Sequence, residues 1–254
     1  MVVRVNPGLG TTYAILDGIR IVFEPTPRGP RALMPVPVTA VPGPTTLGIE
    51  LVTRGGGRER IPVDVAIGSR TYPPREVVVP DSRRALLSDP QVGRQSRLLL
   101  EALRTHSDRA AWSVAFVSPA LVTPLPSFGS PETFVGGDQV DSRMDCTYGE
   151  YHRGMDFQVP AGVAITAPGN GTVILATSFA LTGETLVLDH GQGVVSAFFH
   201  MGRIDVQEGT AIEVSAPLGV AGDTGISGYS HVHWGVYLHG IAVDPLLLGE
   251  VLAQ

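Results

Sequence analysis

The segment Thr185–Phe199 reads Thr-Leu-Val-Leu-Asp-His-Gly-Gln-Gly-Val-Val-Ser-Ala-Phe-Phe, two apolar runs separated by a Gly-Gln-Gly turn. Short runs rich in valine, leucine and phenylalanine and bounded by glycine are typical of buried β-strands. The same pattern occurs on either side of this segment, at Gly171–Thr177 and at Val232–Leu238. The second half of the chain is therefore predicted to be all-β.

The composition favours the same kind of structure for the whole chain. Of the 254 residues, 31 are glycine and 21 are proline, and aromatic residues make up only 6%, which favours short strands joined by tight turns. From Met1 to about Val79, short β-like runs alternate with turns rich in proline and glycine, and they predict a small β-sandwich-like module. These runs are Tyr13–Leu16, Gly18–Phe23, Ile61–Ile67 and Glu76–Val79.

One helix is predicted, at about Asp89–Thr105. Its apolar residues fall at helical spacing in Leu98–Leu103, and Asp89 followed by Pro90 supplies an N-cap and a first-turn proline. The proline-rich segment Ser118–Pro131 then marks the entry into a second domain. We therefore predict a mainly β protein with an N-terminal β-sandwich-like module plus one helix in residues 1–117 and an all-β domain in residues 118–254.

The charged residues and the cysteine content argue against several functions. The net charge is −6, and all 18 cationic residues are arginine, so a basic nucleic-acid interface, Schiff-base chemistry and a P-loop lysine are not expected. The single cysteine, Cys146, excludes an intrachain disulfide and a multi-cysteine zinc site. No apolar run reaches the ~18 residues that cross a bilayer, and Met1–Gly10 lacks a signal-peptide pattern. We expect no transmembrane segment and no signal peptide in this chain, which fits either a cytoplasmic protein or a mature exported one.

Six of the seven histidines lie in the last 103 residues. His152 and Asp156 lie four residues apart and His231 and His233 two apart, and in an extended strand an even separation places two side chains on one face. Imidazole and carboxylate suit zinc, and a catalytic zinc site takes three protein ligands plus a water. The two pairs can supply that set with one histidine left over, but their spacing does not tell which of His231 and His233 would bind the metal. His200 ends the apolar run Val194–Phe199 and could face the same site.

Taken with their neighbours, these positions resemble the LytM/lysostaphin-type zinc metallopeptidases. Tyr151–Phe157 resembles the first signature of that family, Leu186–Gly193 its next block, and His231–Trp234 its His-Leu-His-Trp signature. Phe199–Met201 stands where the family has a His-Leu pair, and Val243–Pro245 resembles its closing motif. The resemblance covers about residues 118–248, in order and without large gaps.

The resemblance implies a duplicated-hybrid-motif type of β fold and a role for each of five residues. His152, Asp156 and His233 match the family's zinc ligands, so one Zn²⁺ per chain is expected. His200 and His231 match its two catalytic histidines that do not bind the metal; which of them is the general base stays open.

The resemblance also implies a substrate and a location. The family cleaves peptide bonds in bacterial peptidoglycan, so we expect a zinc endopeptidase acting on stem peptides or cross-bridges, exported to the periplasm, the cell envelope or the medium. The sequence does not identify the bond that is cleaved or the oligomeric state. Nor does it tell whether the N-terminal module docks substrate, docks a protein partner or occludes the groove.

Two other functions and one form of regulation are also consistent with parts of this sequence. A non-catalytic relative would bind the cell wall or activate another wall hydrolase. A sugar-phosphotransferase carrier domain has a turn-and-strand repeat like Val206–Gly222, but it would need neither Asp156 nor a third histidine. In a latent form of the enzyme, Asp145 or Cys146 could block the open position of the zinc.

Overall fold

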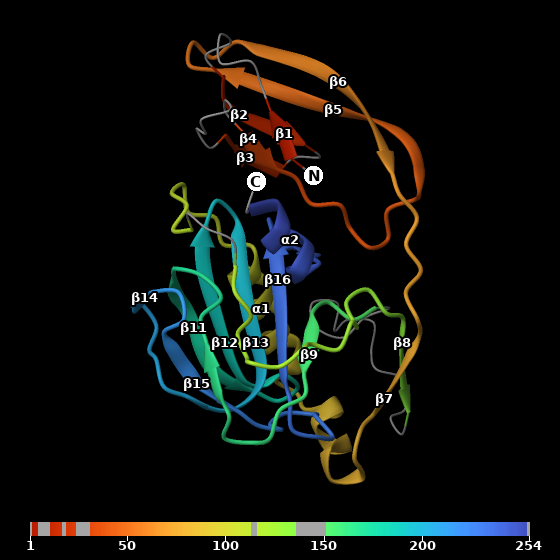
Figure 1. Cartoon of the computed structure of the whole chain (residues 1–254), viewed down its shortest axis with the longest axis vertical. Coiled ribbons are helices and arrows are strands. Elements are labelled where there is room, and N and C mark those ends of the chain that lie inside the picture. The colour runs from red at the N-terminus through yellow and green to blue at the C-terminus, as the bar shows by residue number, and fades with distance from the viewer. Residues whose placement is uncertain are drawn as a thin grey trace. The chain divides into compact units, whose positions relative to one another are not determined.

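The computed structural model describes residues 2–4, 11–16, 19–23, 31–112, 116–135 and 151–252 (Figure 1). By its internal contacts the chain divides into two compact units, Met1–Thr71 and Tyr72–Gln254. No helix within these ranges is long and apolar enough to cross a membrane.

The first unit contains a four-stranded antiparallel sheet in the order β3-β2-β5-β6 and a two-stranded sheet of β1 and β4. Its buried core is aliphatic and includes Met34, Ile49 and Leu51. The predicted strands Tyr13–Leu16 and Ile61–Ile67 lie within β2 and β6. The strands are β1 (Val2–Arg4), β2 (Thr11–Leu16), β3 (Ile19–Val22), β4 (Arg31–Leu33), β5 (Gly43–Thr53) and β6 (Arg58–Ile67).

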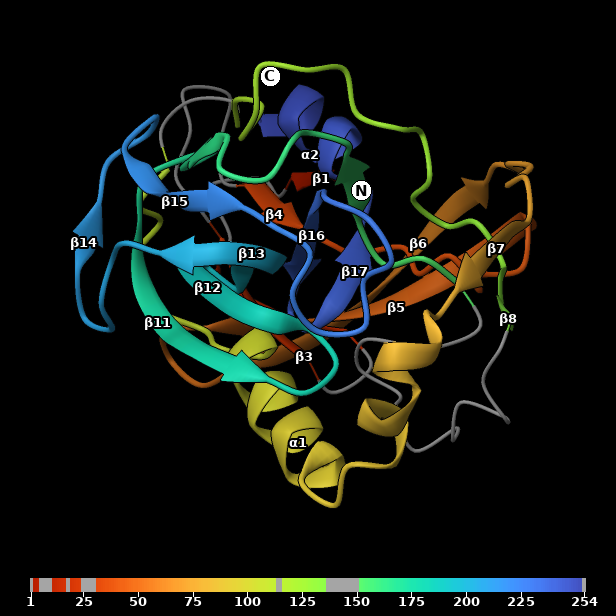
Figure 2. The ribbon, with the colours of Figure 1, turned by 90° about the horizontal axis from the view of Figure 1, so that it is seen from below.

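The second unit is built on a nine-stranded sheet whose main path runs β10-β15-β13-β12-β11-β14, with β16 pairing β13, β17 and β9. The mainly β class predicted from the sequence is confirmed, and the predicted apolar runs form β11, β12, β13 and β16. In Figure 2 these central strands lie side by side. The strands are β9 (Met155–Phe157), β10 (Ala164–Thr166), β11 (Gly171–Phe179), β12 (Gly183–Gly191), β13 (Val194–Ile204), β14 (Ala211–Ile212), β15 (Pro217–Ala221), β16 (Val232–Leu238) and β17 (Ile241–Val243).

Strand β13 changes partner at His200. Residues Val194–Phe199 pair with β16, whereas Met201–Ile204 pair with β15. His200 itself has a φ of 62°, in the left-handed region that side chains other than glycine rarely adopt. The sheet therefore splits at this residue, and the loops between β15 and β16 lie at the split.

The predicted helix is confirmed as α1 (Val92–Leu103), which begins later than expected. Gln91, not Asp89, stands at the N-cap, and the Asp89 carboxylate instead accepts a 2.7 Å hydrogen bond from the Gln91 N–H. A 3₁₀ helix, η2 (Asp81–Ser88), precedes it, and a short helix, α2 (Pro245–Leu252), follows the sheet. Helix α1 packs against β11 and β13 and belongs to the same compact unit as the main sheet.

Two further strands of the second unit pair with each other in parallel, β7 (Arg75–Val78) and β8 (Glu132–Val135). An apolar cluster of Val79, Val92, Leu181 and Ile226 joins the end of β7 and the start of α1 to the loops of the main sheet. This packing places β7 and β8 beside the loop that leads into β16.

Candidate metal centre

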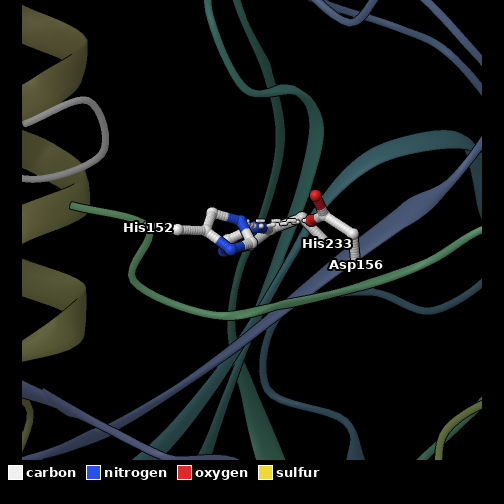
Figure 3. Close-up of side chains that lie close together, drawn as sticks. All are labelled: His152, Asp156 and His233. Atoms are coloured by element: carbon white, nitrogen blue, oxygen red, sulfur yellow. Dashed lines mark hydrogen bonds and ion pairs between the residues drawn. The ribbon is translucent and has the colours of Figure 1, made fainter. Parts of the chain in front are cut away.

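The three predicted metal ligands come together on one pair of strands. Strands β9 and β16 are antiparallel, and their register places Asp156 directly opposite His233. His152 lies just before β9, and all three side chains are buried. The two imidazoles face the Asp156 carboxylate (Figure 3).

The expectation of one extended strand through His152 and Asp156 is wrong, because β9 begins only at Met155. The chain bends at Gly154, where a Cβ would lie 2.5 Å from Nε2 of His233 and 2.6 Å from the Trp234 carbonyl oxygen. A glycine is therefore required by the close approach of the backbone to His233. The bend still places His152 on the same side as Asp156.

The donor atoms form a small triangle. Nε2 of His152 lies 2.9 Å from Nδ1 of His233, and each of these nitrogens lies 3.2 Å from Oδ1 of Asp156. Ligands on a tetrahedron with zinc bonds of 2.0–2.1 Å lie about 3.3 Å apart. The triangle needs to widen by only about 0.1–0.4 Å to fit that geometry, so these residues fit Zn²⁺ in both chemistry and spacing.

The electrostatics favour unprotonated donors. Burial lowers the pKa of His233 to about 4, so its ring is neutral near pH 7. Burial alone would raise the pKa of the Asp156 carboxyl, but the facing His152 and His233 hold it well below its ordinary value. Near neutral pH the site is therefore an ionised carboxylate beside a neutral His233 imidazole, the protonation states in which these groups bind metals.

Arg75 of β7 contacts the outer side of this triangle. Its Nη1 donates a 2.8 Å hydrogen bond to Oδ2 of Asp156 and lies 3.2 Å from Nδ1 of His152, the atoms that point away from the donor triangle. Its Nε lies 3.5 Å from the carboxylate of Glu132 on β8. Burial raises the pKa of Glu132. Nothing in the sequence pattern marks Arg75, which stands 77 residues before the first histidine of the site and outside any motif.

His200 and His231, the two predicted catalytic histidines, lie beside the triangle with their rings 4.9 Å apart. Nδ1 of His200 donates to the Thr224 carbonyl oxygen at 2.9 Å, and Nδ1 of His231 lies 3.1 Å from the Tyr229 carbonyl oxygen. A carbonyl oxygen can only accept, and the Ser227 hydroxyl 3.1 Å from Nδ1 of His231 itself donates to the Tyr229 carbonyl, so both protons are on Nδ1 and both Nε2 atoms carry the lone pair. Burial lowers the pKa of His200 to about 3 and also lowers that of His231, so neither ring is charged near neutral pH.

A cavity of about 310 Å³ opens over these five residues. Arg75, Glu132 and Phe134 line one side of it, from β7 and β8. Ser227 and Tyr229, from the loop before β16, line the other side. Strand β8 therefore borders this cavity.

Two neighbouring residues have a structural part. His190 is fully buried, and its ring nitrogens contact the Asn170 carbonyl at 2.7 Å and the Ser196 hydroxyl at 2.8 Å. The same hydroxyl accepts from the indole of Trp234 at 3.2 Å, which ties this tryptophan beneath the strand of His233. Asp145 and Cys146, considered as blocking ligands, lie outside the described residues.

A buried carboxylate and two imidazoles that could hold a metal ion, beside two further imidazoles at a cavity, form the kind of donor set found in zinc sites. Residues 150–245 match the sequence profile of peptidase family M23. This match confirms the resemblance to LytM/lysostaphin-type peptidases seen in the sequence.

Individual relatives agree with this family. A metalloprotease of Haemophilus influenzae is 32% identical over 96 residues, 37% of this chain and 20% of that protein. The peptidoglycan DD-endopeptidase ShyA of Vibrio cholerae is 26% identical over 95 residues, again 37% of this chain and 22% of its own length. The matched stretch thus spans about a quarter or less of these curated relatives.

One solved structure is similar over nearly the whole chain. It is a crystal structure from Pseudomonas aeruginosa assigned to peptidase M23, with a TM-score of 0.72 and 26% sequence identity. The similarity covers 97% of this chain and 92% of that one. The part of the chain before residue 150 therefore has a counterpart in a protein assigned to peptidase M23.

Proposed function

We propose that this protein is a zinc-dependent endopeptidase that hydrolyses peptide bonds in bacterial peptidoglycan, in stem peptides or cross-bridges, after export from the cytoplasm. The observation that carries the proposal is the donor triangle of His152, Asp156 and His233 beneath a cavity that His200 and His231 also line. The relatives named as peptidoglycan DD-endopeptidases support the substrate class.

Each residue would have a defined part in the reaction. His152 and His233 would hold Zn²⁺ through Nε2 and Nδ1, and Asp156 through Oδ1. When bound, Zn²⁺ supplies Lewis-acid polarisation of a carbonyl group and makes a water molecule more acidic. The free Nε2 atoms of His200 and His231 would accept a proton from the attacking water and return one to the leaving amine. The Nδ1–H bonds to backbone carbonyls keep those Nε2 atoms available.

The proposal predicts two classes of variant. His152→Ala, Asp156→Ala and His233→Ala lose zinc, whereas His200→Ala and His231→Ala keep about one zinc per chain and lose turnover. The measurements are elemental analysis of the purified protein and release of soluble fragments from peptidoglycan. His106→Ala, which removes an exposed histidine elsewhere in the same unit, serves as the control and is expected to behave as wild type.

Two results would contradict the proposal. Wild-type protein that takes up no zinc even after reconstitution would exclude the metal site. Protein that binds one zinc per chain but releases no fragment from any peptidoglycan would identify a non-catalytic relative that binds the wall or activates another hydrolase.

A further inference from the structure

Arg83 of the 3₁₀ helix η2 holds the loop that leads from β15 to β16. Its Nη1 donates to the carbonyl oxygen of Asp223 and, at 2.7 Å, to that of Gly225. Its Nη2 lies 3.1 Å from the Asp223 carboxylate. Nη1 therefore bonds the two carbonyl groups on either side of Thr224, while Nη2 pairs with the Asp223 carboxylate, so the planar guanidinium holds the loop at three points.

Both oxygen atoms of Thr224 form hydrogen bonds. Its carbonyl accepts from Nδ1 of His200, its hydroxyl donates to the Met201 carbonyl at 2.7 Å, and the same hydroxyl accepts from the Glu184 N–H at 2.9 Å. Gly183 packs so closely that a Cβ there would lie 2.1 Å from this hydroxyl. Thr224 thus connects Arg83 to His200 and Met201, where β13 changes its partner strand.

His200 depends on such support because its own backbone is strained. A residue other than glycine at a φ of 62° persists only where its surroundings determine the conformation. The His200 N–H donates to the Thr182 carbonyl at 2.8 Å, which fixes the backbone, but the ring is oriented by the Thr224 carbonyl. A shift of that carbonyl would free the ring to turn or to change its tautomer.

We propose that Arg83 is a positioning residue for His200: by holding the carbonyls of residues 223 and 225, it directs the Thr224 carbonyl at Nδ1 and keeps the lone pair of His200 on Nε2. Neither Arg83 nor Thr224 lines the cavity, so the effect is transmitted through the loop. Arg83 lies well before the segment that matches the peptidase family. The expected change in kcat rests on the proposed function, whereas the expected change in the His200 tautomer does not.

The test compares Arg83→Ala with Arg84→Ala in the full-length, zinc-loaded protein. Arg84 is the next residue of the same 3₁₀ helix, and its guanidinium pairs with Asp81 at 2.7 Å on the surface, so it is a matched control. Long-range ¹H–¹⁵N correlation spectra of ¹⁵N-histidine-labelled protein report the tautomer of each ring, with His200→Ala used to assign the His200 signals. Peptidoglycan digestion gives kcat and KM, and elemental analysis gives the zinc content.

We expect Arg83→Ala to lose the Nδ1-protonated signature of His200 and to lower kcat by about 10- to 100-fold, the usual effect of removing a supporting partner. KM should change by less than about threefold and the zinc content not at all, and Arg84→Ala should match wild type. Arg83→Lys keeps the charge but replaces the two bonding nitrogens with a single ammonium nitrogen, so an intermediate kcat is expected. If the alanine variant does not fold, the lysine variant decides the question.

An Arg83→Ala protein with wild-type His200 signals and wild-type kcat would overturn the proposal. An equal loss in Arg84→Ala would also overturn it, because it would reveal a general effect of the helix. If wild-type protein hydrolyses no peptidoglycan, the proposed function fails, but the tautomer of His200 in the Arg83 variants still decides the positioning role.

Discussion

The glycine between two of the donor residues offers a direct test of how closely this site is packed. In Gly154→Ala the new Cβ would lie 2.5 Å from Nε2 of His233, whereas a normal contact needs about 3.4 Å. The ring would have to move by about 0.9 Å, and the Trp234 carbonyl oxygen at 2.6 Å prevents the backbone from turning the methyl group away. That displacement exceeds the ~0.5 Å within which a functional geometry is held. We therefore expect zinc affinity to fall on the order of 10- to 100-fold.

The assay is a competition between the protein and a chromophoric chelator for Zn²⁺, with the Tm of each metal-free protein measured by circular dichroism. Gly249→Ala is the control, because a Cβ at that helical position meets nothing closer than the Phe116 carbonyl oxygen at 3.6 Å. It should leave zinc affinity unchanged. A Gly154→Ala protein that binds zinc within about threefold of wild type would refute the reasoning, since His233 would then have accommodated the methyl group without leaving its place.

Three other predictions follow from contacts around the sheet. Arg75→Ala removes the charge-assisted hydrogen bond to Oδ2 of Asp156 and should weaken zinc binding about 10-fold in the chelator assay; unchanged affinity would mean that the two histidines hold the carboxylate unaided. Because burial lowers the pKa of His190 to about 4, the unfolded chain takes up a proton between pH 6.5 and 4 that the folded chain does not. The free energy of unfolding should therefore fall as the pH falls through this window, by on the order of 3 kcal/mol. Denaturant unfolding of His190→Gln at a series of pH values should lack this part of the pH dependence. Phe198→Ala empties a fully buried position in β13 and should cost about 3–5 kcal/mol in denaturant unfolding, and a cost below about 1 kcal/mol would contradict the packing described.

The strands around the site could be predicted because their residues are buried on both faces. All eight residues from Val194 to Met201 are buried, and such continuous apolar runs stand out in a sequence. The histidine pairs could be found for a similar reason, since His231 and His233 are neighbours in sequence as well as in space. The roles of His152, Asp156, His200, His231 and His233 were suggested by a resemblance, and the structure adds that these five side chains surround one cavity.

The supporting residues could not be predicted, because nothing local distinguishes them. Arg75 and Arg83 are two of 18 arginines, and in the sequence their neighbourhood is a strand and a turn like others. Their importance comes from contacts with Asp156 and with the loop around Thr224, 81 residues and about 140 residues further along the chain. The start of α1 was misjudged for a related reason: Asp89 and Pro90 suit a helix N-terminus, but Asp89 bonds the Gln91 N–H and the helix begins at Val92.

The parallel pairing of β7 with β8 limits where recombination during evolution can join the second unit to a different N-terminal unit. The segment Tyr72–Leu103 supplies β7, the arginine beside Asp156, the arginine beneath the His200 loop, and an apolar surface that covers Leu181 and Ile226. A recombination event that joined the peptidase domain to a new N-terminal module at residue 118 or 150 would leave all of these behind. Successful exchange of modules is therefore restricted to a narrow junction near residues 68–74, between the last strand of the first unit and the first strand of the second.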